Sequence, residues 1–560
     1  MPRIPQGTPR VSIAVLNRNG EALLDQMFSS FVAVNTWPDI DFLIVDHGST
    51  DGSRAVAERW GRRLPVRVIR CDRNHTFSYS CNRAAEIADG EMLFLLNNDI
   101  LFEEDVVGRM VAAVQATHGL VGLKLFEDPD TLSIDRERRY HHVGIRFRFN
   151  TFKLFTAPYT LMPGPNDGLV THSCAGMPTV TAAAVMCRRA DYLALGGLEE
   201  RYVYGYEDVD LGLKFRLSHG RPVVSANDIR ATHGDGLTRR KRTPGATRRG
   251  WHYHNIRVLD ERFGYAVRRH MYASLLAGDG LWMGRRPTVA LVRTAGGPLA
   301  GLAAALRRLS WTVREMGSEG GELRGVDVLI AGRSDWPLTR LTRPHPNLLT
   351  VLWLTDDDGV PELGRLALAD LRLTTGAHAQ APGFTVLSPG RLPDADAPVA
   401  PEGTWDGCAA RLVALLIDRV LTRHRFAFKL AAPAGPMELA VAEALRDAGH
   451  SVRLDGPDGW EDKLILKDDV AVWLCPAAQA RPQTGRMNVL IGAQEAPTGF
   501  DGALPTLSAA ALADMVEALH PARMLGPADV PLPDRAATVD AAIAEWDRAN
   551  PGDDLLQAKA

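Results

Sequence analysis

The sequence predicts an α/β protein with a mostly parallel sheet in its N-terminal region, and two patterns support this prediction. Short apolar or β-branched runs, each the length of a strand, recur at 11–16, 41–46, 66–71 and 92–96. The segments between these runs space their apolar residues as helices do. Strands and helices that alternate in this way are typical of a parallel sheet covered by helices on both faces. Because the chain has 560 residues, we expect further domains after this one.

Polar residues follow three of the predicted strands. The strand at 11–16 is followed by Asn17-Arg18-Asn19, the second strand ends at Asp46, and the fourth runs into Asn97-Asn98-Asp99. One polar strand end alone favours an ordinary turn, because Asn and Asp are common turn residues. The carboxyl ends of parallel strands, however, lie at the edge of the sheet where α/β proteins bind ligands. These clusters together predict a binding site at that edge.

A tight acidic cluster, Glu207, Asp208 and Asp210, precedes a run of helix-spaced apolar residues. Carboxylates are also favourable at a helix N-terminus, so the cluster alone leaves both interpretations open. His233 and a basic loop that contains Gly and Pro, predicted at 238–249, follow. A single His is usually structural, and a basic run is usually a solvated surface. Taken together, however, these groups would suit a substrate that carries a diphosphate.

Composition and charge exclude several classes of protein. The net charge of −3 makes the whole chain a poor electrostatic partner for nucleic acid or anionic lipid. The six cysteines lack metal-ligand spacing and predict reduced thiols. No run approaches the roughly 18 apolar residues of a membrane span. We therefore expect a soluble, cytoplasmic protein with no nucleic-acid partner and at most peripheral membrane contact.

Two smaller Rossmann-like α/β units are predicted in the second half of the chain. Strand-like runs alternate with helical patterns over 288–400 and again over 426–530. A linker is predicted at 271–287, a linker or helix at 401–425, and a tail at 531–560. The two glycines of 291–297 favour tight packing, and the acidic run at 356–358 favours a plain loop.

The N-terminal region carries a series of motifs, namely VSIAVLNRNG, FLIVDHGSTDGS, CNRAAEIADGEMLFLLNND, GGLEERYVYGYEDVDLGLKFR and the His of ATHGDG. In order and spacing they resemble the motifs of the inverting glycosyltransferases of family 2, over about residues 1–265. The resemblance implies the A-type nucleotide-diphospho-sugar transferase fold (GT-A) over 1–270. It also implies transfer of a sugar from a UDP-, dTDP- or GDP-linked donor to an acceptor hydroxyl, with inversion. The acceptor would be a glycan, a lipid-linked glycan or a protein, as in the biosynthesis of cell-surface polysaccharide or in protein glycosylation.

The resemblance also assigns roles to single residues. Contacts to the nucleotide-sugar donor are implied for Leu16, Asn17, Arg18, Asn19, Asp46, Asn82, Asn97 and Asn98. Asp99 and His233 are implied as metal ligands; oxygen ligands suit Mg²⁺ or Mn²⁺, and an imidazole favours Mn²⁺. Asp208 matches the catalytic base, and Glu207 beside it is expected to orient the acceptor or the loop. Asp210 is expected to face the start of the helix.

Two departures from the family pattern leave an alternative open. His47 stands where the family has a second acidic residue, and the metal motif keeps one carboxylate, Asp99. A catalytically dead, transferase-like scaffold that binds sugar or builds an assembly is therefore the alternative function. A sugar nucleotidyltransferase is disfavoured, because NRNGEALL lacks the Gly-rich turn expected of that class.

The second half resembles, more weakly, the Rossmann-like halves of B-type glycosyltransferases. The matching stretches include MELAVAEALRDAGH and DDVAVWLCP. Because neither unit carries a convincing donor motif, we expect a degenerate scaffold that binds acceptor, positions a partner or builds a homo-oligomer. A second active transferase is the less favoured option.

Overall fold

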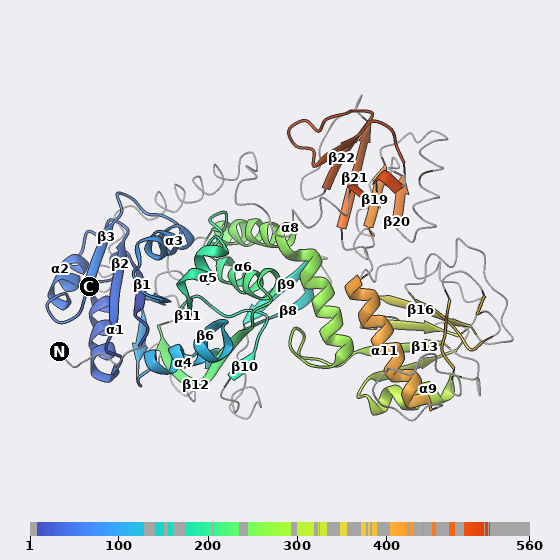
Figure 1. The fold of residues 1–560 in the computed structure, drawn as a ribbon, viewed down its shortest axis with the longest axis horizontal. Helices are drawn as coiled ribbons and strands as arrows, with labels where there is room; N and C mark the ends of the chain where they lie inside the picture. Colours follow the sequence, from blue (N-terminus) through green and yellow to red (C-terminus); the bar gives the residue numbers. More distant parts are fainter. Residues whose placement is uncertain are drawn as a thin grey trace. The chain divides into compact units, whose positions relative to one another are not determined.

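The computed structural model describes most of the N-terminal half of the chain and shorter segments of the rest (Figure 1). The described residues are 8–127, 140–150, 155–160, 174–203, 205–234, 245–292, 299–317, 323, 325–332, 348–354, 371–376, 379–380, 384–388, 404–422, 426–430, 441, 451–454, 470–476, 487–508, 510–512 and 514–515. The chain divides into two compact units, Met1–Arg148 with Ala157–Phe263, and Gly264–Met524 with Phe149–Thr156. Tyr204, the basic residues of 238–244, the run at 356–358 and the predicted tail lie outside the described residues.

The first unit is built on one large, mostly parallel sheet. Its strands are β1 (Val11–Asn17), β2 (Ile40–Asp46), β3 (Val66–Arg70), β4 (Met92–Asn97), β5 (Ile100–Phe102), β6 (Leu120–Glu127), β7 (Tyr140–His142), β10 (Cys174–Gly176), β11 (Ala184–Arg188) and β12 (Val223–His233). Their order is β10-β12-β6-β11-β4-β1-β2-β3, with β5 paired to β12 and β7 to β6. β1 to β4 are parallel to one another, whereas β11 runs antiparallel to both β4 and β6. β8 (Ile145–Asn150) and β9 (Phe155–Thr160) form a separate two-stranded sheet.

Helices cover both faces of this sheet (Figure 1). They include α1 (Glu21–Val34), α2 (Ser53–Trp60), α3 (Phe77–Ile87), α4 (Val107–Thr117) and α5 (Arg189–Ala194). Neighbouring residues of β2 point into two different apolar clusters: Phe42 packs in one cluster with Phe28 of α1, and Leu43 in the other with Ala84 of α3. Every residue of β2 is buried, as expected for a strand covered on both sides. The predicted α/β fold with a mostly parallel sheet is confirmed.

The register of the parallel strands brings their carboxyl ends to one edge of the sheet. Leu16 of β1 is paired with Asn97 of β4, and Asn17 of β1 is paired with Asp46 of β2. The polar residues that follow β1, β2 and β4 therefore start at the same level. The sequence predicted this convergence from the parallel arrangement alone.

β12 brings His233 to the same place from a distant part of the sequence. His233 is paired with Ile100 of β5, the residue directly after Asp99. The register of β12 against β6 shifts between Ala226 and Arg230, so the strand is irregular before it reaches this point. As a result, the last residue of β12 lies beside the end of β4.

Three further helical segments complete the first unit and the chain that leaves it. α6 (Glu207–Leu213) continues directly into a π-helix, η3 (Lys214–Ser218), and α8 spans Gly245–Ala277. The basic loop predicted over 238–249 is wrong in its second part, because α8 begins at Gly245 and includes residues 245–249. Arg has a high helix propensity, so the arginines of this segment are compatible with a helix as well as with a loop.

The second unit contains two further parallel sheets. The strands of one sheet are β13 (Thr288–Val292), β14 (Thr312–Met316), β15 (Val328–Ala331), β16 (Leu349–Leu354), β17 (Leu371–Thr374) and β18 (Thr385–Val386), in the order β14-β13-β15-β16-β17-β18. Its core packs against α9 (Ala300–Arg308) and α11 (Trp405–Thr422). The other sheet holds β19 (Phe426–Leu430), β20 (Ser451–Leu454), β21 (Val470–Pro476), β22 (Met487–Ile491) and β23 (Gly502–Leu504), in the order β20-β19-β21-β22-β23.

These sheets fall within the two regions for which α/β units were predicted, while the predicted domain boundaries stay predictions. Among the helices that the structure describes, none is both long enough and apolar enough to span a bilayer. The predicted cytoplasmic location is not tested by this finding.

Candidate active site

The turns after β1 and β2 are joined by hydrogen bonds. Asn19 has a φ of 45°, in the left-handed region that Asn enters more readily than most residues. Its backbone N–H donates to the Ser49 hydroxyl (2.9 Å), and its side-chain oxygen accepts from the Thr50 N–H (2.8 Å). Ser49 in turn donates to the buried carboxylate of Asp46 through its N–H (3.2 Å) and its hydroxyl. The two turns thus form one fixed wall at the strand ends.

His47, which replaces an acidic residue of the family pattern, is buried beneath this wall. Its Nδ1 lies 3.0 Å from Asn74 Oδ1, and its Nε2 contacts the Ser80 hydroxyl. Burial, together with the charges of His75 and Arg18, lowers the pKa of His47 to about 4. The ring is therefore neutral at pH 7, with Nδ1 donating to Asn74 and Nε2 accepting from Ser80. His47 supplies no charge to the site and instead ties the β2 turn to the start of α3.

The end of β4 is connected to both β1 and β12. Asn98 donates from Nδ2 to Asn17 Oδ1 (2.9 Å). His233 Nε2 lies 3.1 Å from Asp99 Oδ1 and 3.3 Å from Asn97 Nδ2. The side chains of Asp99 and His233 are each 10% exposed, so this pair is shielded but still reachable from solvent. The two predicted metal ligands are therefore neighbours.

Asp208 approaches the same edge of the sheet from α6. Its Oδ2 accepts from the Ala182 N–H (3.4 Å), and its Oδ1 accepts from the Val209 N–H (2.8 Å). The next residue, Ala183, accepts a hydrogen bond from the Asn97 N–H (2.9 Å). Because Ala182 and Ala183 lie directly before β11, which pairs with β4, the carboxylate of Asp208 lies beside the carboxyl end of β4.

Glu207, the other predicted catalytic residue, is buried and turns back toward its own loop. Its Oε2 accepts a hydrogen bond from the Gly205 N–H (2.7 Å). This contact agrees with the expectation that Glu207 orients the loop. Of the predicted donor residues, the structure brings together at this edge Leu16, Asn17, Arg18, Asn19, Asp46, Asn97 and Asn98.

Comparison with known proteins identifies this region. Residues 11–178 match the model of the family described as "Glycosyl transferase family 2". The N-terminal region belongs to glycosyl transferase family 2. The matched residues include β1 to β4 and the polar residues that follow them, whereas Glu207, Asp208, Asp210 and His233 lie after the matched range.

Relatives match only parts of the chain. The O-antigen biosynthesis protein RfbC of Myxococcus xanthus is 30% identical over 243 residues, which are 42% of this chain and 18% of that protein. A PGL/p-HBAD biosynthesis glycosyltransferase of Mycobacterium bovis is 32% identical over 108 residues, 19% of this chain and 42% of that protein. The match therefore spans less than half of the length of either relative.

A solved structure is similar to half of the chain at low sequence identity. It is the mannosyltransferase PcManGT from Pyrobaculum calidifontis in complex with GDP-Man and Mn²⁺. Sequence identity is 16% and the TM-score is 0.31, with 50% of this chain and 67% of that chain covered.

Asp99 and His233 are the two residues predicted to bind a cation. Among the described residues, no group of three His, Cys, Asp or Glu side chains lies close enough together to hold a metal ion. One carboxylate and one imidazole, 3.1 Å apart, nevertheless fit Mn²⁺ or Mg²⁺ if other ligands come from a diphosphate and water. The residues present therefore suit a cation that arrives with a phosphorylated substrate.

Asn82, a predicted donor contact, has its hydrogen-bonding capacity taken up within the protein. Its Nδ2 donates to Leu198 O and Glu200 Oε1, both at 2.9 Å. Its Oδ1 accepts from the Tyr192 hydroxyl (2.7 Å) and the Leu198 N–H (2.9 Å). An amide can make about four such bonds, so Asn82 is fully engaged in fixing α3 to the segment before α6. Its contact with a donor stays a prediction.

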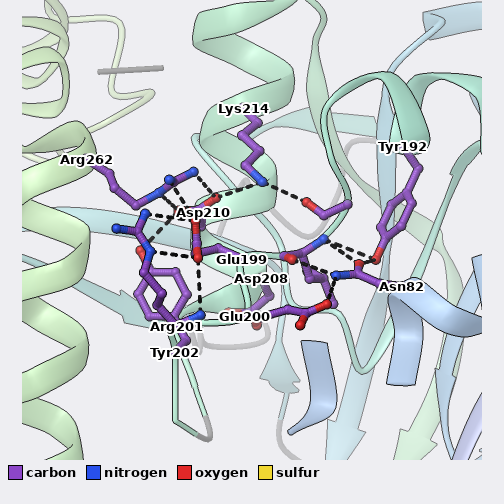
Figure 2. A network of polar contacts seen from close by, with 12 residues as sticks. Asn82, Tyr192, Glu199, Glu200, Arg201, Tyr202, Asp208, Asp210, Lys214 and Arg262 are labelled. Atoms are coloured by element: carbon purple, nitrogen blue, oxygen red, sulfur yellow. Dashed lines mark hydrogen bonds and ion pairs between the residues drawn. The ribbon is translucent and has the colours of Figure 1, made fainter. Parts of the chain in front are cut away.

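Asp210 differs from the expectation that it faces the helix start, because it is fully buried in a network of polar contacts. Figure 2 shows Asp210 between Arg262 and Lys214. Arg262 binds both of its oxygens, at 3.2 Å for Oδ1, and the Tyr202 hydroxyl donates to Oδ2 (3.1 Å). Arg262 also lies 2.8 Å from Glu199. A buried carboxylate requires such partners, and they outweigh the weak field of a helix terminus.

Sequence reasoning missed two residues of α8: Arg262, which contacts this network, and Asn255, which binds the backbone of Val203 and Gly205. Arg262 lies 52 positions after Asp210, so no local spacing connects the two. The one available signal was an Arg and an Asn within a helical pattern, which surface helices also show.

Proposed function

We propose that the first unit transfers a sugar from a nucleotide-diphospho-sugar to an acceptor hydroxyl, with inversion and with a divalent cation. The proposal depends on one observation: Asp99 and Asp208 lie at the same edge of the sheet, and each has different hydrogen-bond partners. Asp99 lies 3.1 Å from His233, whereas Asp208 is held by backbone N–H groups. A cation site and a separate carboxylate are what this reaction requires.

On the donor side, the wall formed by the β1 and β2 turns would hold the base and ribose, with Asp46 as its carboxylate. Asp99 and His233 would hold Mn²⁺ or Mg²⁺, whose charge stabilises the negative charge that develops on the leaving diphosphate. Asn97 and Asn98 keep the end of β4 in place through contacts to His233 and Asn17.

On the acceptor side, Asp208 would take the proton of the attacking hydroxyl. The acceptor oxygen forms a bond to the anomeric carbon while the bond from that carbon to the diphosphate breaks. A single displacement of this kind inverts the anomeric configuration and needs no second nucleophilic carboxylate. Glu207 would keep the loop before Asp208 in position through Gly205.

The acceptor that we propose is a cell-surface glycan or its lipid-linked precursor. Support comes from the name of the Myxococcus xanthus relative, which refers to O-antigen biosynthesis. For the second unit we propose a scaffold role, in binding the acceptor, a partner or another copy of the chain. Support for this role is the lack of a donor motif in its sequence.

A catalytically dead scaffold is the alternative, favoured by the single carboxylate of the metal motif. Purified protein with Mn²⁺ and a panel of UDP-, dTDP- and GDP-sugars distinguishes the two. We expect one donor to be hydrolysed or transferred, with loss of the reaction in EDTA and its return with added Mn²⁺. NMR of the product should show an anomeric configuration opposite to that of the donor. Nucleotide binding without turnover of any donor would favour the scaffold instead.

A further inference from the structure

The segment that leads into α6 is held by side chains of α8. Asn255 accepts from the Val203 N–H at Oδ1 (3.0 Å) and donates from Nδ2 to the carbonyl oxygens of Val203 and Gly205, both at 2.8 Å. His252, one turn earlier, lies with Nδ1 3.2 Å from the Tyr206 hydroxyl. One side chain of α8 therefore binds three backbone groups of this segment, and a second contacts its last side chain.

The backbone of this segment is strained directly before the acidic pair. Tyr206 has a φ of 75° and Gly205 a φ of 129°. The left-handed region is unfavourable for Tyr, and such conformations persist only where the surrounding structure enforces them. Tyr206 is the residue before Glu207, and Asp208 follows. The direction of the first turn of α6 thus depends on the contacts that hold Val203, Gly205 and Tyr206.

A second connection from α8 reaches the far side of the first turn of α6. Arg262 lies seven residues after Asn255, so the two side chains leave the same face of the helix. Its guanidinium binds Asp210 and Glu199 (Figure 2). Asp210 is 0% exposed and Arg262 is 5% exposed, so the ion pair is shielded from water. α8 therefore fixes α6 from both sides of Asp208.

We propose that Asn255 and Arg262 are positioning residues that hold the strained turn before α6, so that the carboxylate of Asp208 points at the acceptor hydroxyl. This inference rests on the proposed function of Asp208 as the base. Neither residue touches the reacting atoms: Asn255 acts through the backbone of Val203 and Gly205, and Arg262 acts through Asp210. His252 supports the same turn through the Tyr206 hydroxyl. The donor side, formed by the turns of β1 and β2, has its own hydrogen bonds and does not depend on them.

The decisive variant is Asn255→Asp, which keeps the shape and the acceptor oxygen for the Val203 N–H. The second oxygen, however, would face two carbonyl oxygens in place of donating to them, so the turn should lose its restraint. We expect kcat to fall by about 10- to 100-fold, because small errors in the position of a catalytic group are costly. KM for the donor and the Kd of the matching nucleoside diphosphate should stay within about twofold.

Arg67→Lys is the matched control. Arg67 pairs with the buried Asp41 (2.8 Å) near the start of β2, at the opposite end of the strand from Asp46. Arg67→Lys weakens the ion pair with the buried Asp41 in the same domain. Residue 67 does not contact the described residues of the segment before α6. Its kcat should equal that of the wild type, even if its melting temperature falls.

Three outcomes overturn the proposal. If Asp208→Asn loses activity but Asn255→Asp turns over normally, the positioning role is wrong while the proposed function stands. An equal rise in donor KM and nucleotide Kd in Asn255→Asp would indicate general loosening of the domain. If the wild type transfers no sugar from any donor, the proposed function and this inference fail together.

A milder variant guards against a failure of Asn255→Asp to fold. His252 is exposed, so His252→Phe should fold while losing the contact to the Tyr206 hydroxyl. We expect kcat to fall by about two- to fivefold with unchanged nucleotide Kd. Should Asn255→Asp prove insoluble, an unchanged kcat in His252→Phe contradicts the proposal.

Discussion

The proposed donor and acceptor sides of the site are held in different ways. On the donor side, the turns after β1 and β2 are linked by neutral hydrogen bonds among neighbours such as Asn19, Ser49 and Thr50. On the acceptor side, the turn before Asp208 is held by a helix about fifty residues further along the chain, through Asn255 and a buried ion pair of Arg262. The conformation of the proposed donor side is therefore set by hydrogen bonds between two neighbouring turns. The orientation of Asp208, in contrast, depends on tertiary contacts with a distant helix.

The largest effect should come from the donor side. Asp99→Asn removes the carboxylate 3.1 Å from His233 and should lower transfer by roughly 10³-fold or more, since loss of one electrostatic stabiliser alone typically costs 10²–10³. Nucleotide affinity should also lose its dependence on Mn²⁺, with little change in the unfolding temperature. Isothermal titration with and without the metal measures this. A variant that still transfers sugar at the normal rate would sink the assignment of Asp99.

The next effect should be confined to the acceptor side. Asp208→Asn keeps the shape of the side chain but cannot accept a proton, so kcat should fall by roughly 10²-fold or more. Nucleotide binding should be almost unchanged, because the donor wall is separate. Steady-state kinetics together with nucleotide titration test this separation. If nucleotide affinity fell as far as kcat, the two sides would not be independent.

Variants on the two sides should also differ in how much unfolding free energy they lose. Arg262→Met leaves the carboxylates of Asp210 and Glu199 without their shared guanidinium inside the domain. Breaking a buried pair in this way costs about 3–5 kcal/mol of unfolding free energy. Chemical denaturation of Arg262→Met and of Ser49→Ala, a donor-side change expected to cost about 1 kcal/mol, gives the comparison. Equal losses in the two variants would contradict it.

Acid should weaken the two sides in different pH ranges. Burial lowers the pKa of His47 from 6.5 to about 4, so the folded state resists its protonation and stability is lost as the pH falls from 6.5 toward 4. Burial alone would raise the pKa of Glu199, but Arg201 and Arg262 outweigh it and lower the pKa from 4.5 to about 2. The stability due to Glu199 is therefore present above 4.5 and is lost as the pH falls toward 2.

Differences between wild type and single variants isolate these two contributions. The stability gap between wild type and His47→Asn should change between pH 6.5 and 4, and that between wild type and Glu199→Gln only below 4.5. Denaturation curves across pH measure both gaps. A gap for His47→Asn that stays constant over its range would show that the buried ring does not resist protonation.

The donor side was predictable from sequence for a physical reason. Parallel strands must present their carboxyl ends at one edge, so polar residues after β1, β2 and β4 had to converge once the strands were recognised. Asn17 is accordingly paired with Asp46 in the sheet, and Asn97 is paired with Leu16, the residue before Asn17. Asp208 and His233 were found by resemblance to a family, because nothing in their local sequence requires either to reach that edge.

The acceptor-side supports could not be predicted in this way. The pairing of Arg262 with Asp210 spans 52 positions, and each residue alone fits an ordinary helix surface. Asn82 likewise forms its four hydrogen bonds with residues more than a hundred positions away, at Tyr192, Leu198 and Glu200. Tertiary packing decides such contacts, and a single sequence carries no periodicity that marks them.

Because β12 is irregular between Ala226 and Arg230, the position of His233 depends on the number of residues in that segment as well as on their identity. Successive side chains of a strand point to opposite faces, so one residue gained or lost between Ala226 and Arg230 would reverse every side chain that follows. With one residue lost, Gly234 would take the place of His233 beside Asp99, and with one residue gained, Thr232 would take it; in both cases the imidazole would face away. The irregular segment therefore decides which side chain of β12 reaches the proposed cation site, and a one-residue deletion there should remove a proposed metal ligand without changing any residue of the site.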